Sequence, residues 1–398
     1  MEKIDVAIVG GGPVGGYIAY LLAQKGYSTS IIEEHHTIGL PLKCAGLISP
    51  RVFDGIPILK EKLIENTIKG AHIHSPSGEI LTIGGNKNHA LVINRTLFDQ
   101  NLIQKAEETG AILKNQSKVI DAKKENNKIS ITIKNNDDKI SKIDSSLVIG
   151  ADGPHSIIRR RFNFPEPKEF LISIGAEVEH IHLDPTFVEI FLGRQIAPGF
   201  FAWAIPTNTQ GTKARIGLCI EKHAPFSIKK YFNTLLKNPI FQDINILKYL
   251  GGTIPLGYLK KTTCNNILLA GDAAAQVKPT SGGGIYPGLV CAKKCSTVVI
   301  DALQSNDFSN KKLIQYHQSW TAEIGKELSF GMSFRRIFNK LDDKQLNNYL
   351  KKLNQPKNID ILNRYGDIDF PSKLIFPLIK KNPSFVKLFP KLITKDVK

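Results

Sequence analysis

The sequence predicts an α/β fold built on a parallel sheet, and three observations support this fold class. An apolar, β-branched run near the N-terminus leads into a glycine-rich turn, a helical segment and a second short strand. Two later apolar runs, near residues 148 and 266, end in Gly-Ala-Asp-Gly and Ala-Gly-Asp before further helical segments. The length of 398 residues and the hydrophobic fraction of 42% indicate two or three packed domains and exclude a disordered or disulfide-held chain.

The N-terminal unit has the order of elements that dinucleotide binding requires. Its predicted parts are a strand at 4–9, a glycine turn at 10–15, a helix at 17–25 and a strand at 29–32. Gly10, Gly12 and Gly15 form G-x-G-x-x-G, which allows a tight turn and close approach of a pyrophosphate to the helix N-terminus. Glu33 is placed to accept hydrogen bonds from ribose hydroxyls, which favours FAD or NAD over NADP. The alternative is a glycine-rich surface turn.

Two later motifs distinguish FAD from NAD. Residues 148–159 read Val-Ile-Gly-Ala-Asp-Gly-Pro-His-Ser-Ile-Ile-Arg, and residues 271–284 contain Gly-Asp followed by Pro-Thr-Ser-Gly-Gly-Gly. With the first motif, they resemble the FAD-dependent reductases and hydroxylases related to aromatic hydroxylases. The resemblance implies a Rossmann-like FAD-binding domain of the glutathione-reductase and aromatic-hydroxylase type, with Asp152 among the cofactor-binding residues.

Asp272 and the glycines that follow it are expected to hold the flavin. Asp272 ends an apolar strand, where its carboxylate can bind a ribityl hydroxyl. Gly283, Gly284 and Ile285 open a helix whose N–H groups can stabilise negative charge on reduced flavin. The alternatives are an ordinary helix cap for Asp272 and a flexible loop for the glycines.

The stretch between these motifs supplies two more expected cofactor contacts. A helix is predicted from residue 94 to about residue 108, with Gly110 ending it. The resemblance implies that Arg95 reaches the cofactor phosphates, and the alternative is a solvated charge at a helix end. A polar-faced hairpin is predicted from residue 129, with its turn at 135–138. The resemblance also implies that Val119, in the strand before this hairpin, contacts adenine through its backbone.

Residues 41–46 read Pro-Leu-Lys-Cys-Ala-Gly and narrow the resemblance to one group. They are similar to the P-x-x-C-G segment of FAD-dependent geranylgeranyl reductases, with Ala45 where that family has glycine. In that family the segment lies along the flavin. Cys44, Ala45 and Gly46 are therefore expected cofactor contacts.

Residues 201–206, Phe-Ala-Trp-Ala-Ile-Pro, are similar to an aromatic motif of the same family. The resemblance implies a strand in the substrate domain whose aromatic face lines an apolar cavity. Phe201, Trp203 and Pro206 are the predicted substrate contacts. The alternative is a plain core strand.

The C-terminal third extends the resemblance over essentially the whole chain. Trp320, the runs at 325–328 and 334–338, and Gly-Asp-Ile-Asp-Phe-Pro at 366–371 resemble archaeal digeranylgeranylglycerophospholipid reductases in their order. That group saturates isolated double bonds of geranylgeranyl chains on ether lipids. The resemblance implies hydride transfer from N5 of reduced FAD to one alkene carbon and protonation of the other. Cys44 is the predicted catalytic residue, as proton donor or as the group that shapes the pocket, and the alternative is a small apolar filler.

The motifs divide the chain into three predicted parts. Residues 1–75, 90–165 and 262–305 are expected to form a discontinuous FAD-binding domain, and residues 76–89 and 166–261 an antiparallel-sheet substrate domain. Residues 306–398 are expected to form a helical C-terminal part. Its tail, residues 371–398, has seven lysines against one acidic residue and is broken into short amphipathic pieces by four prolines. The tail either lies on an anionic membrane surface or docks on the protein with its lysines outward.

The formal net charge of +17 suits an anionic lipid better than nucleic acid, because no groove-reading motif accompanies the lysines. Expected partners are a geranylgeranylated glycerophospholipid, an electron donor (ferredoxin or NAD(P)H) and an anionic membrane surface. Five cysteines without paired spacing and the lack of a long apolar run favour a cytoplasmic protein, peripheral on the inner face of the cell membrane. No metal site is predicted, since Cys291 and Cys295 have no further ligands nearby. A flavin-dependent aromatic monooxygenase and a membrane-associated flavin electron-transfer dehydrogenase are the alternative functions.

Overall fold

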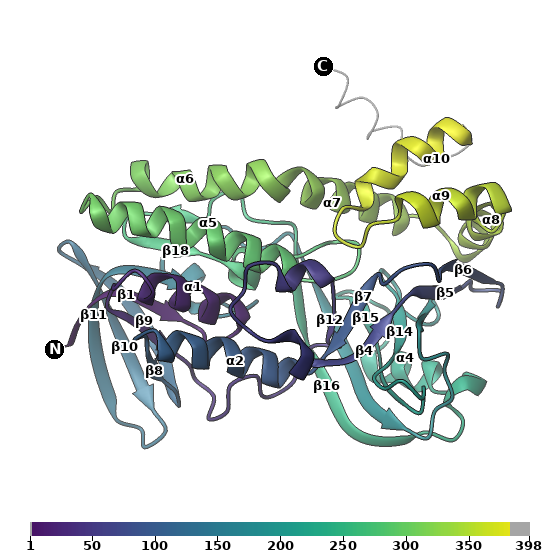
Figure 1. Cartoon of the computed structure of the whole chain (residues 1–398), viewed down its shortest axis with the longest axis horizontal. Helices are drawn as coiled ribbons and strands as arrows, with labels where there is room; N and C mark the ends of the chain where they lie inside the picture. The colour runs from purple at the N-terminus through teal and green to yellow at the C-terminus, as the bar shows by residue number, and fades with distance from the viewer. Residues whose placement is uncertain (1, 383–398) are drawn as a thin grey trace.

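The computed structural model describes residues 2–382 and confirms the predicted α/β fold (Figure 1). An eight-stranded sheet lies on the left of Figure 1 and a seven-stranded sheet on the right, with helices along the top. A small three-stranded sheet is the third sheet of the described residues.

The eight-stranded sheet carries the N-terminal unit. Its strand order is β17-β18-β11-β1-β2-β8, and the hairpin β9–β10 adds to β11. The strands are β1 (Glu2–Val9), β2 (Thr29–Ile32), β8 (Ile112–Lys114), β9 (Ser117–Glu125), β10 (Lys128–Asn135), β11 (Ile140–Gly150), β17 (Thr263–Cys264) and β18 (Ile267–Leu269). β1 pairs in parallel with β2 and β11, and β11 pairs in parallel with β18. The carboxyl ends of these four strands therefore meet at one edge.

Both faces of this sheet are buried. One face packs against α1 (Pro13–Ala23), α2 (Arg95–Glu108) and α5 (Ile285–Gln304), with α6 (Asn310–Trp320) behind α5. The other face is covered by the β9–β10 hairpin and α3 (Ile157–Arg161). Burial on both sides explains why the central strands are continuous apolar runs in the sequence.

The seven-stranded sheet is mostly antiparallel and has the order β16-β12-β15-β14-β13-β5-β6. Its strands are β5 (Gly70–His74), β6 (Ile80–Gly84), β12 (Glu169–Glu179), β13 (Phe187–Phe191), β14 (Ala202–Pro206), β15 (Lys213–Glu221) and β16 (Asn245–Leu256), and α4 (Ile228–Leu235) packs on it. β5 pairs with β13. The sequence-based boundaries place residues 70–74 in the FAD-binding part, whereas in the structure this strand belongs to the second sheet.

The three-stranded sheet joins the two halves. It consists of β3 (Leu47–Ile48), β7 (Ala90–Ile93) and β4 (Ile64–Ile68), in that order. β3 directly follows the 41–46 segment, and β7 directly precedes α2. This sheet therefore fixes the start of α2 relative to the segment that contains Cys44.

The C-terminal part is helical, as predicted. A π-helical turn (Thr321–Gly325) links α6 to α7 (Lys326–Phe338), and α8 (Asp343–Leu353), α9 (Pro356–Tyr365) and α10 (Ile375–Lys381) follow. α10 packs through Leu378 against Ile361 of α9, while Phe376 is 77% exposed. Residues 383–398 of the predicted basic tail lie outside the described residues.

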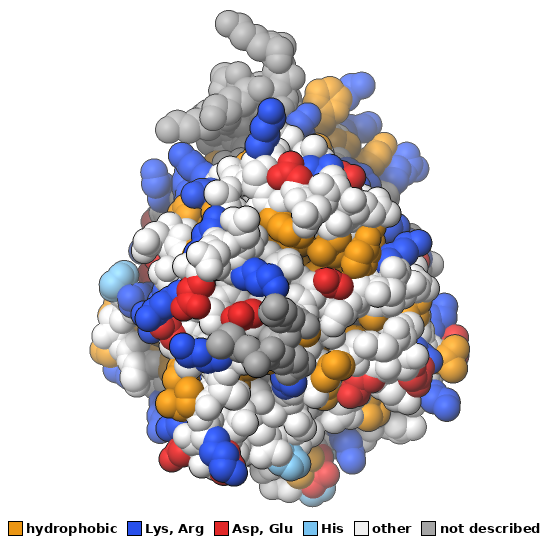
Figure 2. All heavy atoms as spheres, turned by 90° about the vertical axis from the view of Figure 1, so that its left-hand side faces the viewer, with side chains coloured by type: hydrophobic (Ala, Val, Ile, Leu, Met, Phe, Trp, Pro, Cys, Tyr) orange, Lys and Arg blue, Asp and Glu red, His pale blue; other side chains and the backbone are white. Residues whose placement is uncertain are grey.

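Basic and acidic side chains are mixed on the side of the molecule that Figure 2 shows. Figure 2 shows Lys and Arg side chains across a whole side of the molecule, interspersed with acidic ones. Within residues 2–382, no helix combines the length and apolar character needed to span a bilayer.

Candidate active site

The predicted cofactor residues meet at the carboxyl edge of the parallel sheet. Gly10 follows β1, Glu33 follows β2, Asp152 lies two residues after β11, and Asp272 lies just beyond β18. Ligands of doubly wound α/β proteins bind at this edge. The topology therefore brings together four residues that are separated by up to 262 positions in the sequence.

The glycine turn has backbone contacts that only glycine allows. Gly10 has φ +106°, and a Cβ there would lie 2.3 Å from the Ala151 carbonyl oxygen. A Cβ on Gly15 would lie 2.0 Å from the Gly10 carbonyl oxygen. A Cβ on Gly12 would meet no atom within 4 Å. Gly10 and Gly15 thus shape the turn, whereas Gly12 leaves room beside the N-terminus of α1.

Glu33 faces this turn. Its carboxylate accepts hydrogen bonds from the backbone N–H of Gly11 at 2.8 Å and of His35 at 2.9 Å. The strand with Val119 starts nearby, because the Ser117 N–H donates to the Glu33 carbonyl at 2.7 Å. The Val119 side chain is buried in the core of the hairpin, so its backbone is the part available to a ligand. Contact with adenine stays a prediction.

Asp152 begins the turn that leads to α3. One carboxylate oxygen accepts hydrogen bonds from Ile157 N–H at 2.7 Å and Ile158 N–H at 3.3 Å, and the other is buried without a partner. Burial raises the pKa of Asp152. The nearby Arg159 is 2% exposed and donates to the Ala273 carbonyl at 3.2 Å, which ties this turn to the one after β18.

Asp272 lies in a buried turn beside the glycines at 283 and 284. A Cβ on Gly284 would lie 2.8 Å from its carboxylate, so glycine is required for this approach. Burial raises the pKa of Asp272 to about 6, although Arg95 acts in the opposite direction. Gln276 closes the turn by accepting from Gly271 N–H at 2.7 Å.

The raised pKa of Asp272 predicts a pH-dependent gain in stability for Asp272→Asn in the FAD-free protein. The folded-state pKa of about 6 exceeds the unfolded value near 4, so folding of the wild type loses stability as pH rises through this range. Asparagine does not titrate, and the full effect is on the order of 2–3 kcal/mol. Urea unfolding at pH 5 and pH 7.5 should show a larger gain at pH 7.5. A gain of equal size at both pH values would exclude Asp272 as the titrating group.

Arg95 is not the solvated charge that the alternative interpretation described. Its side chain is 11% exposed, and one guanidinium nitrogen donates to both carboxylate oxygens of Asp99 at 3.1 Å. Its Nε is buried without a partner. Burial alone lowers the pKa of Arg95, but Asp99 and Cys44 outweigh burial and raise it. Arg95 therefore lies beside Cys44 and stays charged; its contact with cofactor phosphates stays a prediction.

The Cys44 segment is a partly exposed loop. The Gly46 N–H donates to the Cys44 sulfur at 3.4 Å, and Gly46 has φ +76°. Ala45 packs in an apolar cluster with Leu47 and Trp203. Cys44 is thus more accessible than Cys219, Cys291 and Cys295, which are fully buried.

Arg215 of β15 holds this loop from the second sheet. It is 4% exposed and donates to the carbonyl oxygens of Ala45 at 3.2 Å and Ile93 at 3.0 Å. Glu65 and Glu177 pair with its remaining nitrogens at 2.7 and 3.0 Å. A single side chain therefore connects the segment after Cys44 with the strand before Arg95.

Two of the three predicted substrate residues pack together at the start of β14, with Phe201 just before the strand and Trp203 within it. Phe201 and Trp203 contact edge to face at 6.2 Å, and the indole N–H of Trp203 is buried without a partner. Pro206 is buried at the end of the strand, where its carbonyl accepts from Asn66 at 3.0 Å. Alternation along the strand puts Pro206 on the opposite face from Trp203. Their contacts with a substrate stay predictions.

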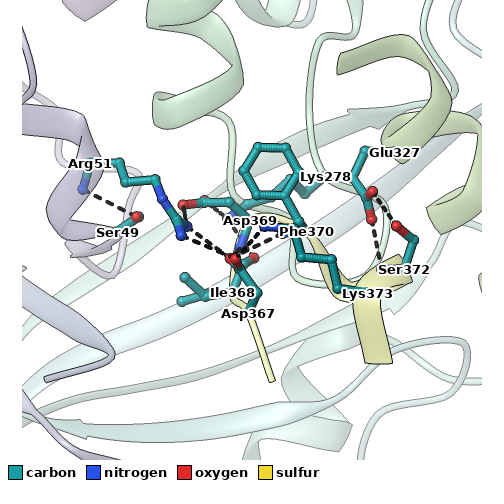
Figure 3. A network of polar contacts seen from close by, with 10 residues as sticks. All are labelled: Ser49, Arg51, Lys278, Glu327, Asp367, Ile368, Asp369, Phe370, Ser372 and Lys373. Atoms are coloured by element: carbon teal, nitrogen blue, oxygen red, sulfur yellow. Dashed lines mark hydrogen bonds and ion pairs between the residues drawn. The ribbon is translucent and has the colours of Figure 1, made fainter. Parts of the chain in front are cut away.

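The predicted glycine turn before Ile285 is built around a buried lysine. Lys278 N–H donates to the Gly283 carbonyl at 3.1 Å, and α5 begins at Ile285. The Lys278 ammonium donates to the Ile368 carbonyl at 3.0 Å and to Asp369 at 2.9 Å (Figure 3). Segments about 90 residues apart thus meet at this turn.

The residues at this edge fit an FAD molecule. Gly12 offers open space next to the N-terminus of an 11-residue helix, where a pyrophosphate is stabilised. Asp152 and Arg95 each keep one buried polar atom without a hydrogen-bond partner. These groups match the donors and acceptors of a ribityl or phosphate moiety.

Sequence reasoning assigned no role to Arg159, Arg215, Lys278 or Asp369. Arg159, Lys278 and Asp369 lie inside the motifs at 148–159, 271–284 and 366–371, but those motifs do not indicate which partners the three side chains bind. The side-chain partners of Arg215, Lys278 and Asp369 lie at least 90 positions away, apart from the Arg215 contact with Glu177. No local pattern signals such pairs.

Comparisons with known proteins agree with the geometry. Residues 3–290 match the FAD binding domain family. The chain is 32% identical to an uncharacterised protein of Methanocaldococcus jannaschii over 94% of its own length and 95% of that protein. It is 28% identical to the digeranylgeranylglycerophospholipid reductase of the same organism over 98% of this chain and 99% of that one. A crystal structure of a geranylgeranyl bacteriochlorophyll reductase-like protein from Thermoplasma acidophilum superposes with a TM-score of 0.87 at 25% identity, covering 98% of this chain and 100% of that chain.

Proposed function

This chain belongs to the FAD binding domain family, in its group of FAD-dependent geranylgeranyl reductases, and from this premise we propose that it saturates isoprenoid double bonds of geranylgeranyl chains on archaeal ether phospholipids. The protein is an FAD-dependent oxidoreductase. The observation that carries the substrate proposal is the meeting of the Cys44 loop and the Trp203 face in one apolar cluster, beside the edge that fits FAD.

An isolated alkene has no carbonyl group to polarise it, so the site must supply alignment and a proton donor. FAD held at this edge would, in its reduced state, supply the hydride that one alkene carbon accepts. The Cys44 thiol donates the proton to the other carbon and becomes a thiolate. The Gly46 N–H, 3.4 Å from the sulfur, and the charged Arg95 stabilise that thiolate. Phe201 and Trp203 orient the geranylgeranyl chain of the substrate and exclude water.

The decisive test is reduction of a lipid by the purified protein. Dithionite-reduced holoenzyme, incubated anaerobically with digeranylgeranylglycerophospholipid, should add one hydrogen pair for each saturated bond, as measured by mass spectrometry. An unchanged lipid mass would refute the substrate proposal.

Cys44→Ala is expected to lower the rate of lipid reduction by about 10²–10⁴-fold while FAD stays bound. The reason is the loss of the proposed proton donor. Cys264→Ala is the matched control, because Cys264 is also partly buried but lies on β17. Full activity of Cys44→Ala with bound FAD would exclude a chemical role for this thiol.

The relatives support a reductase over an aromatic monooxygenase or an electron-transfer dehydrogenase, since the named relatives align over nearly the whole chain. The electron donor is proposed to be ferredoxin or NAD(P)H.

A cytoplasmic location at the inner face of the membrane is proposed from the five free cysteines and the basic tail. Liposome co-sedimentation of the chain with and without residues 383–398 tests the membrane contact, and equal binding to anionic liposomes would remove the tail from this role.

A further inference from the structure

Residues 366–373 form a strap that joins α9 to α10. Figure 3 shows its side chains between the turn after β3 and the Lys278 turn. The strap contains two carboxylates, Asp367 and Asp369, and begins at Gly366. Its carboxylates pair with Arg51, in the turn after β3, and with Lys278, before the glycine turn at 282–284.

Asp369 is the buried centre of the strap. Its side chain has no exposed surface, and its two oxygens bind different cations: Lys278 at 2.9 Å and Arg51 at 3.0 Å. A fully buried carboxylate is costly unless it is paired in this way. Asp369 therefore links two segments that are 227 positions apart, one after the Cys44 loop and one before the glycine turn.

Asp367 closes the outer side of the same network. It accepts from both terminal nitrogens of Arg51, at 2.8 and 3.0 Å, and from the backbone N–H of Asp369 at 3.0 Å. Burial alone would raise the pKa of Asp367, but hydrogen bonds led by that from Arg51 lower it to about 2. The outer ion pair therefore stays charged at any pH where the protein is handled.

Lys278 contacts both Asp369 and the glycine turn at 282–284. Its side chain is 10% exposed, and a Cβ on Gly283 would lie 3.0 Å from its Cε and 3.5 Å from its Nζ. The Gly282 N–H donates to the Lys278 carbonyl at 2.8 Å. The ammonium group is thus packed against the turn, and it donates hydrogen bonds to the Ile368 carbonyl and to Asp369.

The strap also contacts the two other sides of the site. Ile368 packs in the cluster that holds Ala45 and Trp203. Phe370 meets Tyr286, in the first turn of α5, edge to face at 6.1 Å. The strap therefore packs on the same apolar cluster as Ala45 and Trp203, and it contacts the first turn of α5.

We propose that Asp369 is a positioning residue, which holds the Lys278 ammonium against the glycine turn at 282–284 so that this charge stabilises FAD bound there. Reduction of a flavin adds negative charge to its ring, and a fixed cation at the binding turn favours that state. The inference rests on FAD binding at this turn and not on the lipid substrate. FAD titration therefore tests it independently of the lipid assay.

The test compares Lys278→Met and Asp369→Asn with the wild type. Both variants should raise the FAD dissociation constant by roughly tenfold to a hundredfold, the range for losing a charge-assisted hydrogen bond. Both variants should lower the flavin midpoint potential. The FAD dissociation constant of the double variant should be no higher than that of the single variant that binds FAD less tightly. Flavin fluorescence on titration of the apoprotein gives the affinity, and dye-coupled reduction of the holoenzyme gives the potential. Asp369→Glu, which keeps the carboxylate, should recover part of both.

Asp367→Asn is the matched control. It removes a strap carboxylate that pairs with Arg51 and does not touch Lys278, and asparagine can still accept from the Asp369 N–H. It should leave FAD affinity within about twofold, the size expected of a partly exposed pair. Wild-type affinity and potential in Asp369→Asn, or a raised potential, would overturn the proposal. If Asp369→Asn does not fold, unchanged values in Lys278→Met decide against it equally.

Discussion

Gly15→Ala is expected to reduce FAD affinity by roughly a hundredfold and to lower the free energy of unfolding of the apoprotein by about 1–3 kcal/mol. The added Cβ would lie 2.0 Å from the Gly10 carbonyl oxygen, so the backbone of one of the two residues has to shift. Gly10 is itself fixed at φ +106° against Ala151. Relief of this clash would therefore displace the turn between β1 and α1, which lies at the carboxyl edge of the sheet.

Gly12→Ala separates loss of the cofactor from loss of the fold. Gly12 has φ −75°, a conformation open to alanine, and its Cβ would meet no protein atom within 4 Å. The unfolding free energy of the apoprotein should change by no more than about 0.5 kcal/mol. FAD affinity should still fall by about tenfold or more, because the second glycine of this motif allows the pyrophosphate to approach the backbone. Urea unfolding measures the effect on stability, and flavin fluorescence measures the effect on FAD affinity. Unchanged FAD binding in Gly12→Ala would mean that the pyrophosphate does not bind at the N-terminus of α1.

The parallel unit was predictable because its signals are local. Strand 29–32 is β2, and the helix expected from 94 to 108 is α2, with Asn94 accepting from Leu97 N–H as its cap. The first helix begins at Pro13 instead of Tyr17, since proline suits the first helical position. Each feature depends on neighbours within a few positions.

The long-range side-chain contacts that hold the site together could not be predicted from local signals. Lys278 and Asp369 are 91 positions apart, and Arg215 is 170 positions from Ala45. A lysine or aspartate in a loop is usually solvated, so composition gives no reason to expect burial. The sheet that β5 joins could not be predicted either, because its partner β13 lies more than 110 positions away and the residues of β5 do not indicate which strand they pair with.

Arg215→Met is expected to abolish lipid reduction and to lower the free energy of unfolding by about 3–5 kcal/mol, the cost of breaking a buried ion pair. The substitution leaves Glu65 and Glu177 without their cation and the carbonyls of Ala45 and Ile93 without their donor. Because Ala45 follows Cys44 directly, the loop with the proposed proton donor loses its attachment to the second sheet. Gly46 contributes to this dependence, since a Cβ there would lie 2.4 Å from the Arg215 guanidinium.

Arg215→Lys and Arg335→Met distinguish positioning from general stability. Lysine keeps the charge but cannot reproduce the forked hydrogen bonds, so Arg215→Lys should fold while its Cys44 loop is loosened. The rate of Cys44 alkylation by iodoacetamide, measured across pH 6–9 in a background without Cys264, should then rise relative to the wild type. Arg335 is the matched control, since it is 3% exposed and pairs with Glu169 at 2.9 Å, away from residues 44–46. Arg335→Met should lose comparable stability and leave the alkylation profile unchanged. The same profile in Arg215→Lys and the wild type would mean that Arg215 supports the fold without setting the position of Cys44.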